Sequence, residues 1–307
     1  VEVGGEKDGS VVLSAQLGSD IVRAFDSGQV EVTVDDDGAS VVSGRSNFSL
    51  RVMSSEEYPK FDEPNGESVT LDAGSVADAL DQVIKAASLD DARQILTGVL
   101  MAAEEDGLRF VATDSYRLAV RDLPGTAVLG RDQTVLVPSR ALDMVRKILG
   151  GAENLTIRLG ERDASFEIDD VQVITRLIEG EFPNYRGLIP DDHPNVLVVD
   201  RIALQEAVGR VRILAQESTP VRLSMSSDGL ELVAITQDVG QAHESLDATY
   251  EGSDLTVAFN PQFLLDGLEV SPGDEVRLET SEASKPAVLR SMGDEQFLYL
   301  LMPVRVT

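Results

Sequence analysis

Residues 106–113 (DGLRFVAT) decide the fold, because residues 228–235 (DGLELVAI) repeat them 122 positions further along the chain. Each stretch places an Asp-Gly pair, typical of a tight hairpin turn, before a run in which apolar residues recur at alternate positions. Such a run predicts a β-strand with one buried face. Self-similarity at a fixed distance indicates that the same domain is built more than once.

Two kinds of unit alternate along the chain, and each reads as a strand, an amphipathic helix and three further strands. The unit that contains residues 106–113 begins at residues 69–72 and recurs from residues 197–200. The other unit occurs three times, about 120 residues apart. One domain therefore joins two β-α-β-β-β units, so the chain holds two whole domains and the second half of another.

We place these domains at residues 1–66, 67–193 and 194–307, and we expect the first half of the first domain to be missing. The predicted fold class is α+β, with helices on one face of antiparallel sheets. Strands are expected at residues 11–13, 95–103 and 297–304, among others.

The helix predicted at residues 75–87 illustrates the pattern. Val76, Leu80 and Val83 fall on one stripe with the period of a helix that lies on a sheet. Ser75 is expected to cap its first turn.

Composition excludes several classes of chemistry. The chain has 307 residues, 42% of them hydrophobic, and 54 acidic against 26 basic residues give a net charge of −28. With no cysteine it has no disulfides, cysteine zinc sites, iron–sulfur clusters or thiol catalysis, and two histidines leave little for a multi-histidine metal centre. A charge of −28 would by itself argue against nucleic acid, whose binding normally needs a basic face.

The charge is unevenly distributed between helices and sheets. The helical windows 18–27, 74–87, 138–149, 200–214 and 260–268 together hold eight cations and eight anions, so the excess acid lies in strands, turns and loops. A surface made of these helices is therefore predicted to be much less acidic than the sheets. An equally weighted alternative is that each cation only balances a local carboxylate at i, i+4 spacing. The cations are Arg23, Lys85, Arg140, Arg146, Lys147, Arg201, Arg210 and Arg212.

Motifs of common enzyme classes are missing from the sequence, which has no GxxxxGK[ST], GxGxxG, HExxH or GxSxG. Carboxylates are abundant, so an acidic carbohydrate-acting hydrolase with two of them roughly 5–10 Å apart in a cleft is the alternative reading. Acidic clusters such as residues 35–37 are, however, typical of solvated turns. A repeat adhesin would need an export signal and calcium-type loops, and neither is evident. We predict no catalytic residue, metal or cofactor.

Four separated motifs carry a family resemblance. They are residues 43–50 (SGRSNFSL), 111–119 (VATDSYRLA), 181–185 (EFPNY) and 299–305 (YLLMPVR). Together with the repeat, their order and spacing resemble the β subunit of bacterial DNA polymerase III, the sliding clamp, over essentially the whole chain.

The resemblance implies a DNA clamp fold and a function without catalysis. Repeated units would place helices on the inner face and antiparallel sheets outside, in a head-to-tail homodimeric ring that encircles duplex DNA and confers processivity. The eight helix cations named above would face DNA, and weak, non-specific attraction suits a protein that slides.

The resemblance also implies a docking groove for short linear motifs. Its partners would be the DNA polymerase III alpha subunit, the clamp loader and repair polymerases. Apolar residues would form a slot for two side chains of the bound peptide, and Arg and Asn would fix its polar groups. By similarity the groove consists of Arg93, Leu96, Thr113, Ser115, Tyr116, Arg117, Leu118, Pro183, Leu188, Asn260, Phe263, Met302, Pro303, Val304 and Arg305.

A third implied site is the dimer interface. An edge strand at residues 45–50 would pair with the third domain of the neighbouring subunit, where Glu244 could face Arg45. The chain shows neither an export signal nor an apolar run of membrane-spanning length, so we expect a bacterial cytoplasmic, nucleoid-associated protein. The interface residues expected are Arg45, Phe48, Leu50, Ile213, Leu214 and Glu244.

Overall fold

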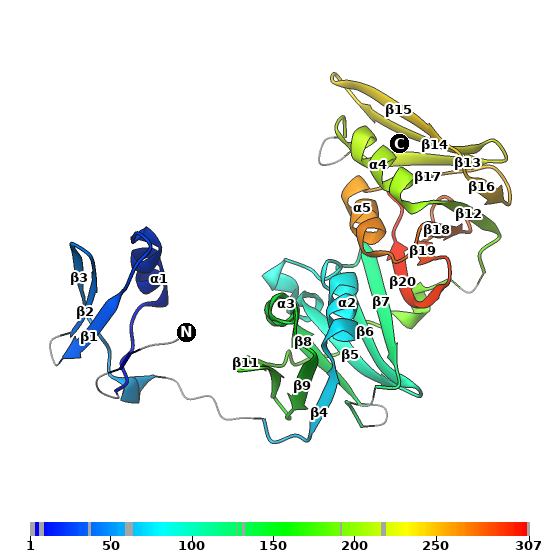
Figure 1. Cartoon of the computed structure of the whole chain (residues 1–307). Coiled ribbons are helices and arrows are strands. Elements are labelled where there is room, and N and C mark those ends of the chain that lie inside the picture. Colours follow the sequence, from blue (N-terminus) through cyan, green and yellow to red (C-terminus); the bar gives the residue numbers. More distant parts are fainter. Residues whose placement is uncertain are drawn as a thin grey trace. The chain divides into compact units, whose positions relative to one another are not determined.

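The chain divides into two compact units, Val1–Asp62 and Glu63–Thr307 (Figure 1). The computed structural model describes residues 4–5, 9–35, 38–58, 64–126, 128–130, 133–190, 192–215 and 219–305, and of residue 57 only the backbone. Each unit is described by itself.

The first unit is a helix with a small antiparallel sheet. It contains α1 (Ala15–Ala24), β1 (Glu31–Asp35), β2 (Gly38–Ser43), β3 (Ser46–Leu50) and the short 3-10 helix η1 (Ser55–Glu57). The sheet order is β1-β2-β3, so β3 is an edge strand of this sheet, as predicted for residues 45–50. The strand predicted at residues 11–13 is wrong, because only an isolated bridge joins Val12 to Met53 there.

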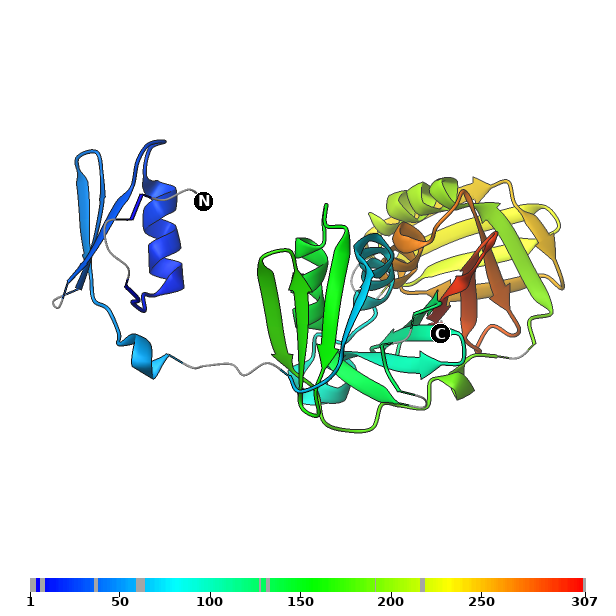
Figure 2. The ribbon, with the colours of Figure 1, turned by 60° about the horizontal axis from the view of Figure 1, so that its bottom comes forward.

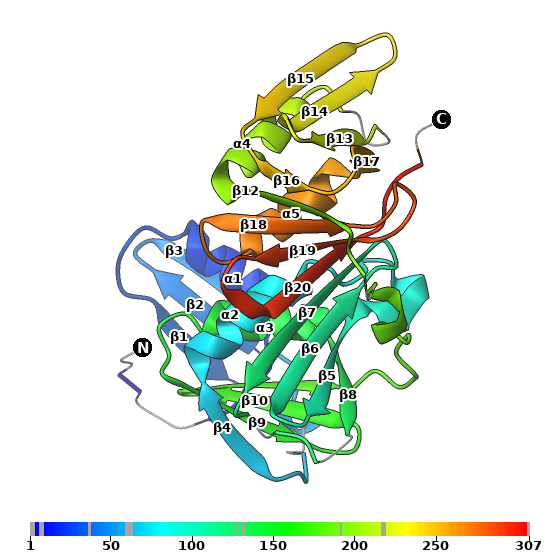
Figure 3. The same ribbon diagram turned by 90° about the vertical axis from the view of Figure 1, so that its right-hand side faces the viewer.

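The second unit contains two repeats that share one sheet. The nine strands lie in the order β16-β12-β18-β19-β20-β7-β6-β5-β8 (Figure 3), and two four-stranded sheets, β11-β10-β9-β4 and β15-β14-β13-β17, flank them. The elements of the first repeat are β4 (Ser68–Asp72), α2 (Ala73–Ile84), η2 (Asp91–Thr97), β5 (Gly98–Glu104), β6 (Gly107–Thr113), β7 (Arg117–Pro124), β8 (Thr134–Pro138), α3 (Ser139–Ile148), β9 (Asn154–Leu159), β10 (Asp163–Ile168) and β11 (Val171–Arg176).

The second repeat follows the same order after the short helix η3 (Arg186–Leu188). Its last strand, β20, pairs antiparallel with β7 of the first repeat, from Phe297 opposite Arg121 to Leu301 opposite Arg117. The elements are β12 (Asn195–Asp200), α4 (Arg201–Arg212), β13 (Val221–Ser226), β14 (Gly229–Thr236), β15 (Gly240–Leu246), β16 (Thr249–Glu251), β17 (Leu255–Phe259), α5 (Pro261–Val270), β18 (Glu275–Thr280), β19 (Ala287–Ser291) and β20 (Asp294–Leu301).

The helices of the second unit lie beside one another on one side of its sheets (Figure 2). Helix α2 contacts both α3 and α5, and α5 contacts α4. Their apolar stripes are buried, as Val76, Leu80 and Val83 of α2 illustrate. The predicted separation of a helical layer from a sheet layer is therefore confirmed within this unit.

Three local predictions need correction. Asp72, not Ser75, caps α2, because its carboxylate accepts the backbone N–H of Ser75 at 2.7 Å. The strand predicted at residues 95–103 begins only at Gly98, since a 3-10 helix occupies Asp91–Thr97. The last strand ends at Leu301, so residues 302–304 are a tail outside the sheet.

Candidate functional site

A tight turn between β6 and β7 is built around Asp114. Its Oδ1 atom accepts the backbone N–H groups of Tyr116 at 2.9 Å and Arg117 at 3.0 Å. Ser115 has a φ of +79°, a left-handed conformation that few residues other than glycine adopt. Thr113 closes the turn by donating its hydroxyl to the Arg117 carbonyl at 2.6 Å. The turn leaves the Tyr116 side chain 59% exposed.

The Arg117 guanidinium lies where β7, α5 and β20 meet. Its Nε donates to Asp114 at 3.0 Å, and its Nη1 pairs with Asp266 of α5 and donates to the Tyr299 hydroxyl at 3.3 Å. Its Cζ lies 4.4 Å from the centre of the Phe263 ring, a cation–π contact. Burial acts to lower the pKa of Arg117, but Tyr299 and Asp266 outweigh it and raise that pKa above its ordinary value. The guanidinium is therefore a fixed charge.

The Tyr299 ring lies against α5 because residue 267 is glycine. A Cβ atom at Gly267 would come 2.6 Å from the Tyr299 ring, closer than real contacts allow. The Tyr299 hydroxyl donates to the Phe263 carbonyl at 3.0 Å. Burial raises the pKa of Tyr299, and the nearby Arg117 only partly opposes this, so the phenol stays protonated.

An aromatic pair, the exposed Tyr116 and the half-buried Phe263, and the C-terminal tail lie over this junction. The Tyr116 and Phe263 rings stack with centroids 6.4 Å apart. The tail is held by two backbone hydrogen bonds, from Met302 N to the Tyr116 carbonyl at 2.9 Å and from Val304 N to the Ala258 carbonyl at 2.8 Å. Met302 and Val304 are 36% and 38% exposed. We call the surface formed by Tyr116, Phe263, Met302 and Val304 the seam surface.

The structure thus brings the core of the predicted docking groove together. Arg93 also contacts the turn, since its Nη1 donates to the Asp114 carbonyl at 3.0 Å, and Asn260 caps α5 by accepting the Gln262 N–H at 2.8 Å. Leu118 and Thr113 are instead buried, at 1% and 3% exposure. Leu118 packs in an apolar cluster with Tyr185 and Leu300, whereas Phe263 packs against the other core cluster. Of the other predicted residues, Leu96 and Pro303 are half-buried, and Ser115, Pro183, Leu188 and Arg305 are exposed.

Sequence reasoning missed the residues that fix this geometry. Asp114 and Tyr299 lie inside motifs that carried the family resemblance, which was the one available signal. In the sequence, Asp266 was only one of the eight anions of the helical windows. Nothing in the sequence placed it beside Arg117, 149 positions earlier.

Most of the predicted DNA-facing cations in the second unit form ion pairs with carboxylates. Lys85 contacts Glu269 at 2.6 Å, and Arg140 contacts Asp91 at 3.2 Å. Arg201 instead donates to the Gly273 carbonyl at 2.7 Å. The alternative of local balance at i, i+4 spacing holds for Lys147 with Asp143 and for Arg210 with Glu206, whereas Lys85 and Arg140 pair with carboxylates distant in sequence.

One carboxylate of α3 balances two cations. Asp143 contacts Lys147 at 2.6 Å and Arg146 at 2.9 Å, while Arg146 also reaches Asp81 of α2 at 2.8 Å. The hydrogen bonds from Lys147 and Arg146 lower the pKa of Asp143. Arg212 is exposed and has no ion pair among the described residues of the chain, and Arg23 lies exposed on α1 of the first unit.

The predicted interface residues lie at edge strands or are exposed. Ile213 is 81% exposed after α4, and Leu214 and Leu50 are half-buried. Phe48 is 38% exposed and packs edge-on against Phe25 at 5.6 Å. Glu244 lies on β15, an edge strand of its sheet, and pairs with Arg210 of the same chain at 2.8 Å. A contact of Glu244 with the exposed Arg45 of a neighbouring subunit stays a prediction.

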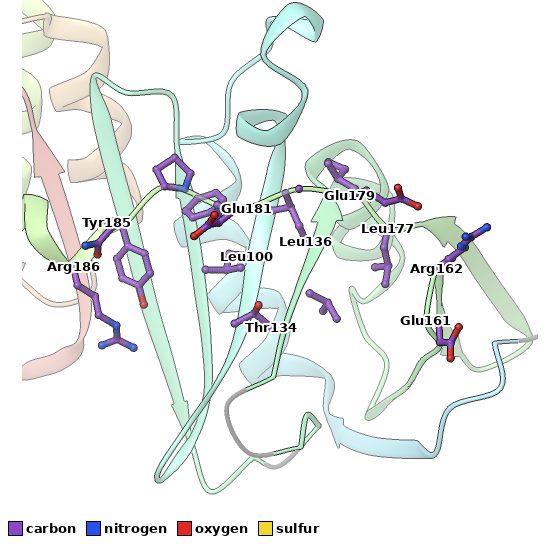
Figure 4. A pocket seen from close by; sticks show the side chains of 16 residues that line it. Leu100, Thr134, Leu136, Glu161, Arg162, Leu177, Glu179, Glu181, Tyr185 and Arg186 are labelled. Carbon is purple, nitrogen blue, oxygen red and sulfur yellow. The ribbon is translucent and has the colours of Figure 1, made fainter.

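A cavity of about 590 Å³ lies beneath the segment that follows β11. Figure 4 shows Leu100, Leu136 and Leu177 along it, with Tyr185 and Arg186 at one end. Pro183 of the predicted groove also lines it. In the described part of the chain, no group of three or more His, Asp or Glu residues could hold a metal ion. No described helix has the length and apolar character needed to cross a membrane.

Comparison with known proteins matches the whole chain to one family. Three sequence models of the DNA polymerase III beta subunit match in order: the N-terminal domain at residues 1–62, the central domain at 70–184 and the C-terminal domain at 186–305. The beta sliding clamp of Streptomyces coelicolor is 36% identical over 100% of this chain and 85% of its own length. That of Bacillus subtilis is 30% identical over 98% of this chain and 81% of its own length.

Solved structures agree with these sequence relatives. A sliding clamp from Bartonella birtlesii bound to griselimycin is 31% identical, with a TM-score of 0.93, and covers 100% of this chain and 84% of its own. A Caulobacter crescentus clamp, solved with polyethylene glycol at a putative beta-motif tethering region, is 26% identical, with a TM-score of 0.91 and coverage of 98% and 83%. The chain therefore belongs to the beta sliding clamp family, the beta subunits of bacterial DNA polymerase III.

Proposed function

We propose that this chain is a sliding clamp that encircles duplex DNA as a homodimer and tethers the replicative polymerase. It acts without catalysis, as a processivity factor. The observation that carries the proposal is the match of all three beta-subunit domains in order along the chain. The domain division at residues 66/67 and 193/194 and the association with the bacterial nucleoid are parts of the same proposal.

The helical layer of the second unit supports a loose hold on DNA. Arg140, Arg146, Lys147 and Arg210 are exposed to solvent to different degrees, yet each has a carboxylate within 4 Å. Phosphates must compete with these carboxylates, so each cation adds little to affinity. Such a surface suits a ring that retains DNA by topology and slides along it.

The seam surface supports a docking site for short linear motifs. Tyr116, Met302 and Val304 give it exposed aromatic and aliphatic side chains at the junction of two repeats, and the half-buried Phe263 stacks against Tyr116. Apolar anchors of a bound peptide gain most where such side chains are held in place. The partners proposed are the alpha subunit of DNA polymerase III, the clamp loader and repair polymerases.

The edge strands β3 and β15 support a dimer in which one subunit's strand extends the partner's sheet. The proposed contacts are Arg45, Phe48, Leu50, Ile213, Leu214 and Glu244. The carbohydrate-acting hydrolase has no support, because the relatives are named as sliding clamps.

Topological retention tests the proposal. The chain is loaded by a bacterial clamp loader onto primed circular DNA, and the bound fraction is followed after gel filtration. We expect the protein to remain on the circle and to leave rapidly once the circle is linearised. Equal dissociation from circular and linear DNA would contradict a sliding clamp.

A further inference from the structure

We propose that Asp266 is a positioning residue of the docking site. It holds the Arg117 guanidinium over the Phe263 ring, and so fixes the half-buried Phe263 and the exposed Tyr116 before any ligand arrives. The inference rests on the proposed function, because it concerns the same site, and it assigns a role to a helix residue that no motif indicated.

The first support is the number of elements that converge on one guanidinium. Arg117 comes from β7, Asp266 from α5 and Tyr299 from β20, so the contact joins both repeats. The Arg117 and Asp266 side chains are only 11% and 13% exposed. A buried pair of this kind is unfavourable to break, and without Asp266 the guanidinium would keep only part of its compensation, from Asp114.

The second support is that both oxygens of the Asp266 carboxylate are engaged. One pairs with Arg117, and the other accepts the Gln262 amide at 2.6 Å. Gln262 lies one turn earlier on α5, where its backbone N–H is held by the capping residue Asn260. The carboxylate therefore has one orientation, and it transmits that orientation to the guanidinium.

The third support is the pair of contacts that the Phe263 ring makes with Arg117 and Tyr116. The Phe263 ring contacts both the Arg117 guanidinium, 4.4 Å from its centre, and the Tyr116 ring, 6.4 Å away. The Tyr116 carbonyl in turn accepts the N–H of Met302 in the tail. Releasing Arg117 would remove its contact with the Phe263 ring. Three residues of the seam surface, Phe263, Tyr116 and Met302, would then be held less firmly. A ligand would then have to order them on binding, which lowers its affinity.

Asp266 is a sharper test of this idea than Asp114. The Asp114 carboxylate also holds two backbone N–H groups of the turn, so its loss would disrupt the turn itself. Asp266 reaches the seam surface only through side chains. Asp266→Asn keeps the size of the side chain and removes its charge.

The matched control is Glu269→Gln on the same helix. It removes the same charge from an exposed pair, with Lys85, that lies outside the seam surface. Exposed pairs contribute little to stability, so this variant should bind a docking ligand as the parent chain does. The ligand probe is griselimycin, with which two similar clamps were solved, and binding is measured by titration calorimetry.

A second readout follows the free protein. The chain has no tryptophan, so Tyr116→Trp creates a single fluorophore in the aromatic pair. We expect Asp266→Asn to weaken griselimycin about tenfold and to raise the mobility of Trp at position 116, seen as faster anisotropy decay. Asp266→Glu, which keeps the charge, should recover part of both. Glu269→Gln should change neither.

The outcomes separate the two proposals. Unchanged affinity and unchanged anisotropy decay in Asp266→Asn overturn the positioning role. Should that variant not fold, the same criteria apply to Asp266→Glu, which must then show a weaker version of both effects. If the parent chain does not bind griselimycin, the docking site itself fails, and the anisotropy comparison still decides whether Asp266 orders the aromatic pair.

Discussion

Glu244 receives two hydrogen bonds from Arg210 of the same chain, Nε to Oε1 at 2.8 Å and Nη2 to Oε2 at 3.1 Å. The bidentate contact joins the last turn of α4 to the edge strand β15. It raises the pKa of Arg210 and lowers that of Glu244, so both stay ionised at neutral pH. The Glu244 carboxylate thus restrains Arg210, a predicted DNA contact. It also lies on β15, an edge strand proposed for the dimer interface.

Removing that carboxylate should strengthen DNA binding. Glu244→Gln releases Arg210 toward phosphates, and each added phosphate contact steepens the dependence of log affinity on log salt by about 0.9. Binding to short duplex DNA is measured by fluorescence anisotropy over a series of salt concentrations. Glu231→Gln is the control, because it changes net charge equally but pairs with His243 instead. A salt slope equal in both variants would remove Arg210 from the DNA face.

Reversing three cations of the helical layer should impair the hold on DNA. Arg140→Glu, Arg146→Glu and Arg210→Glu together place like charges beside Asp91, Asp143 and Glu244, and repel phosphates. Loading on primed circles and primer-extension length report the effect. The control is Arg176→Glu, on the 85%-exposed arginine of β11. Normal loading of the triple variant, with its fold checked by circular dichroism, would contradict the assignment of this face.

Truncation after Leu301 should abolish ligand docking with little loss of stability. The truncation removes the Met302 and Val304 side chains and two backbone hydrogen bonds, each with a net contribution of about 1 kcal/mol. Griselimycin titration and the melting temperature give the two readouts. Truncation after Val304 keeps those contacts and is the control. Binding that survives the longer truncation would place the docking site elsewhere.

Leu118→Ala should lower stability far more than any exposed residue of the docking site. Its side chain is 1% exposed within the sheet, and large-to-small core substitutions cost about 2–5 kcal/mol. Urea denaturation measures the loss. Leu188→Ala, at a side chain 43% exposed, is the comparison and should change stability little. Equal effects would mean that Leu118 faces solvent.

The repeat and the order of elements could be predicted because they are local in sequence. The Asp-Gly turns lead directly into β6 at Gly107 and β14 at Gly229. The cap of α2 was assigned to Ser75 rather than Asp72 because both residue types cap helices, and only the backbone path selects between them. The choice between two such caps depends on the local backbone conformation.

Ion pairs within one helix, such as Asp143 with Lys147, follow from local spacing, but pairs between elements could not be predicted, because their partners lie far apart in the chain. Lys85 and Glu269 are separated by 184 positions, and Arg117 and Asp266 by 149. The summed charge of the helical windows predicted a layer much less acidic than the sheets. It gave no pairing between individual side chains. The groove residues were found through their motifs, whereas the burial of Leu118 depends on the second repeat packing across the sheet.

The pairing of β7 with β20 has a mechanical meaning. Five residue pairs, from Phe297 and Arg121 to Leu301 and Arg117, join the repeats through backbone hydrogen bonds. A force applied by a partner bound at the seam surface would act on this β7–β20 pairing. The two repeats could separate there only if these backbone hydrogen bonds broke. The proposed docking site therefore lies at a junction closed by backbone pairing. We expect a ring made from this chain to open at a different boundary.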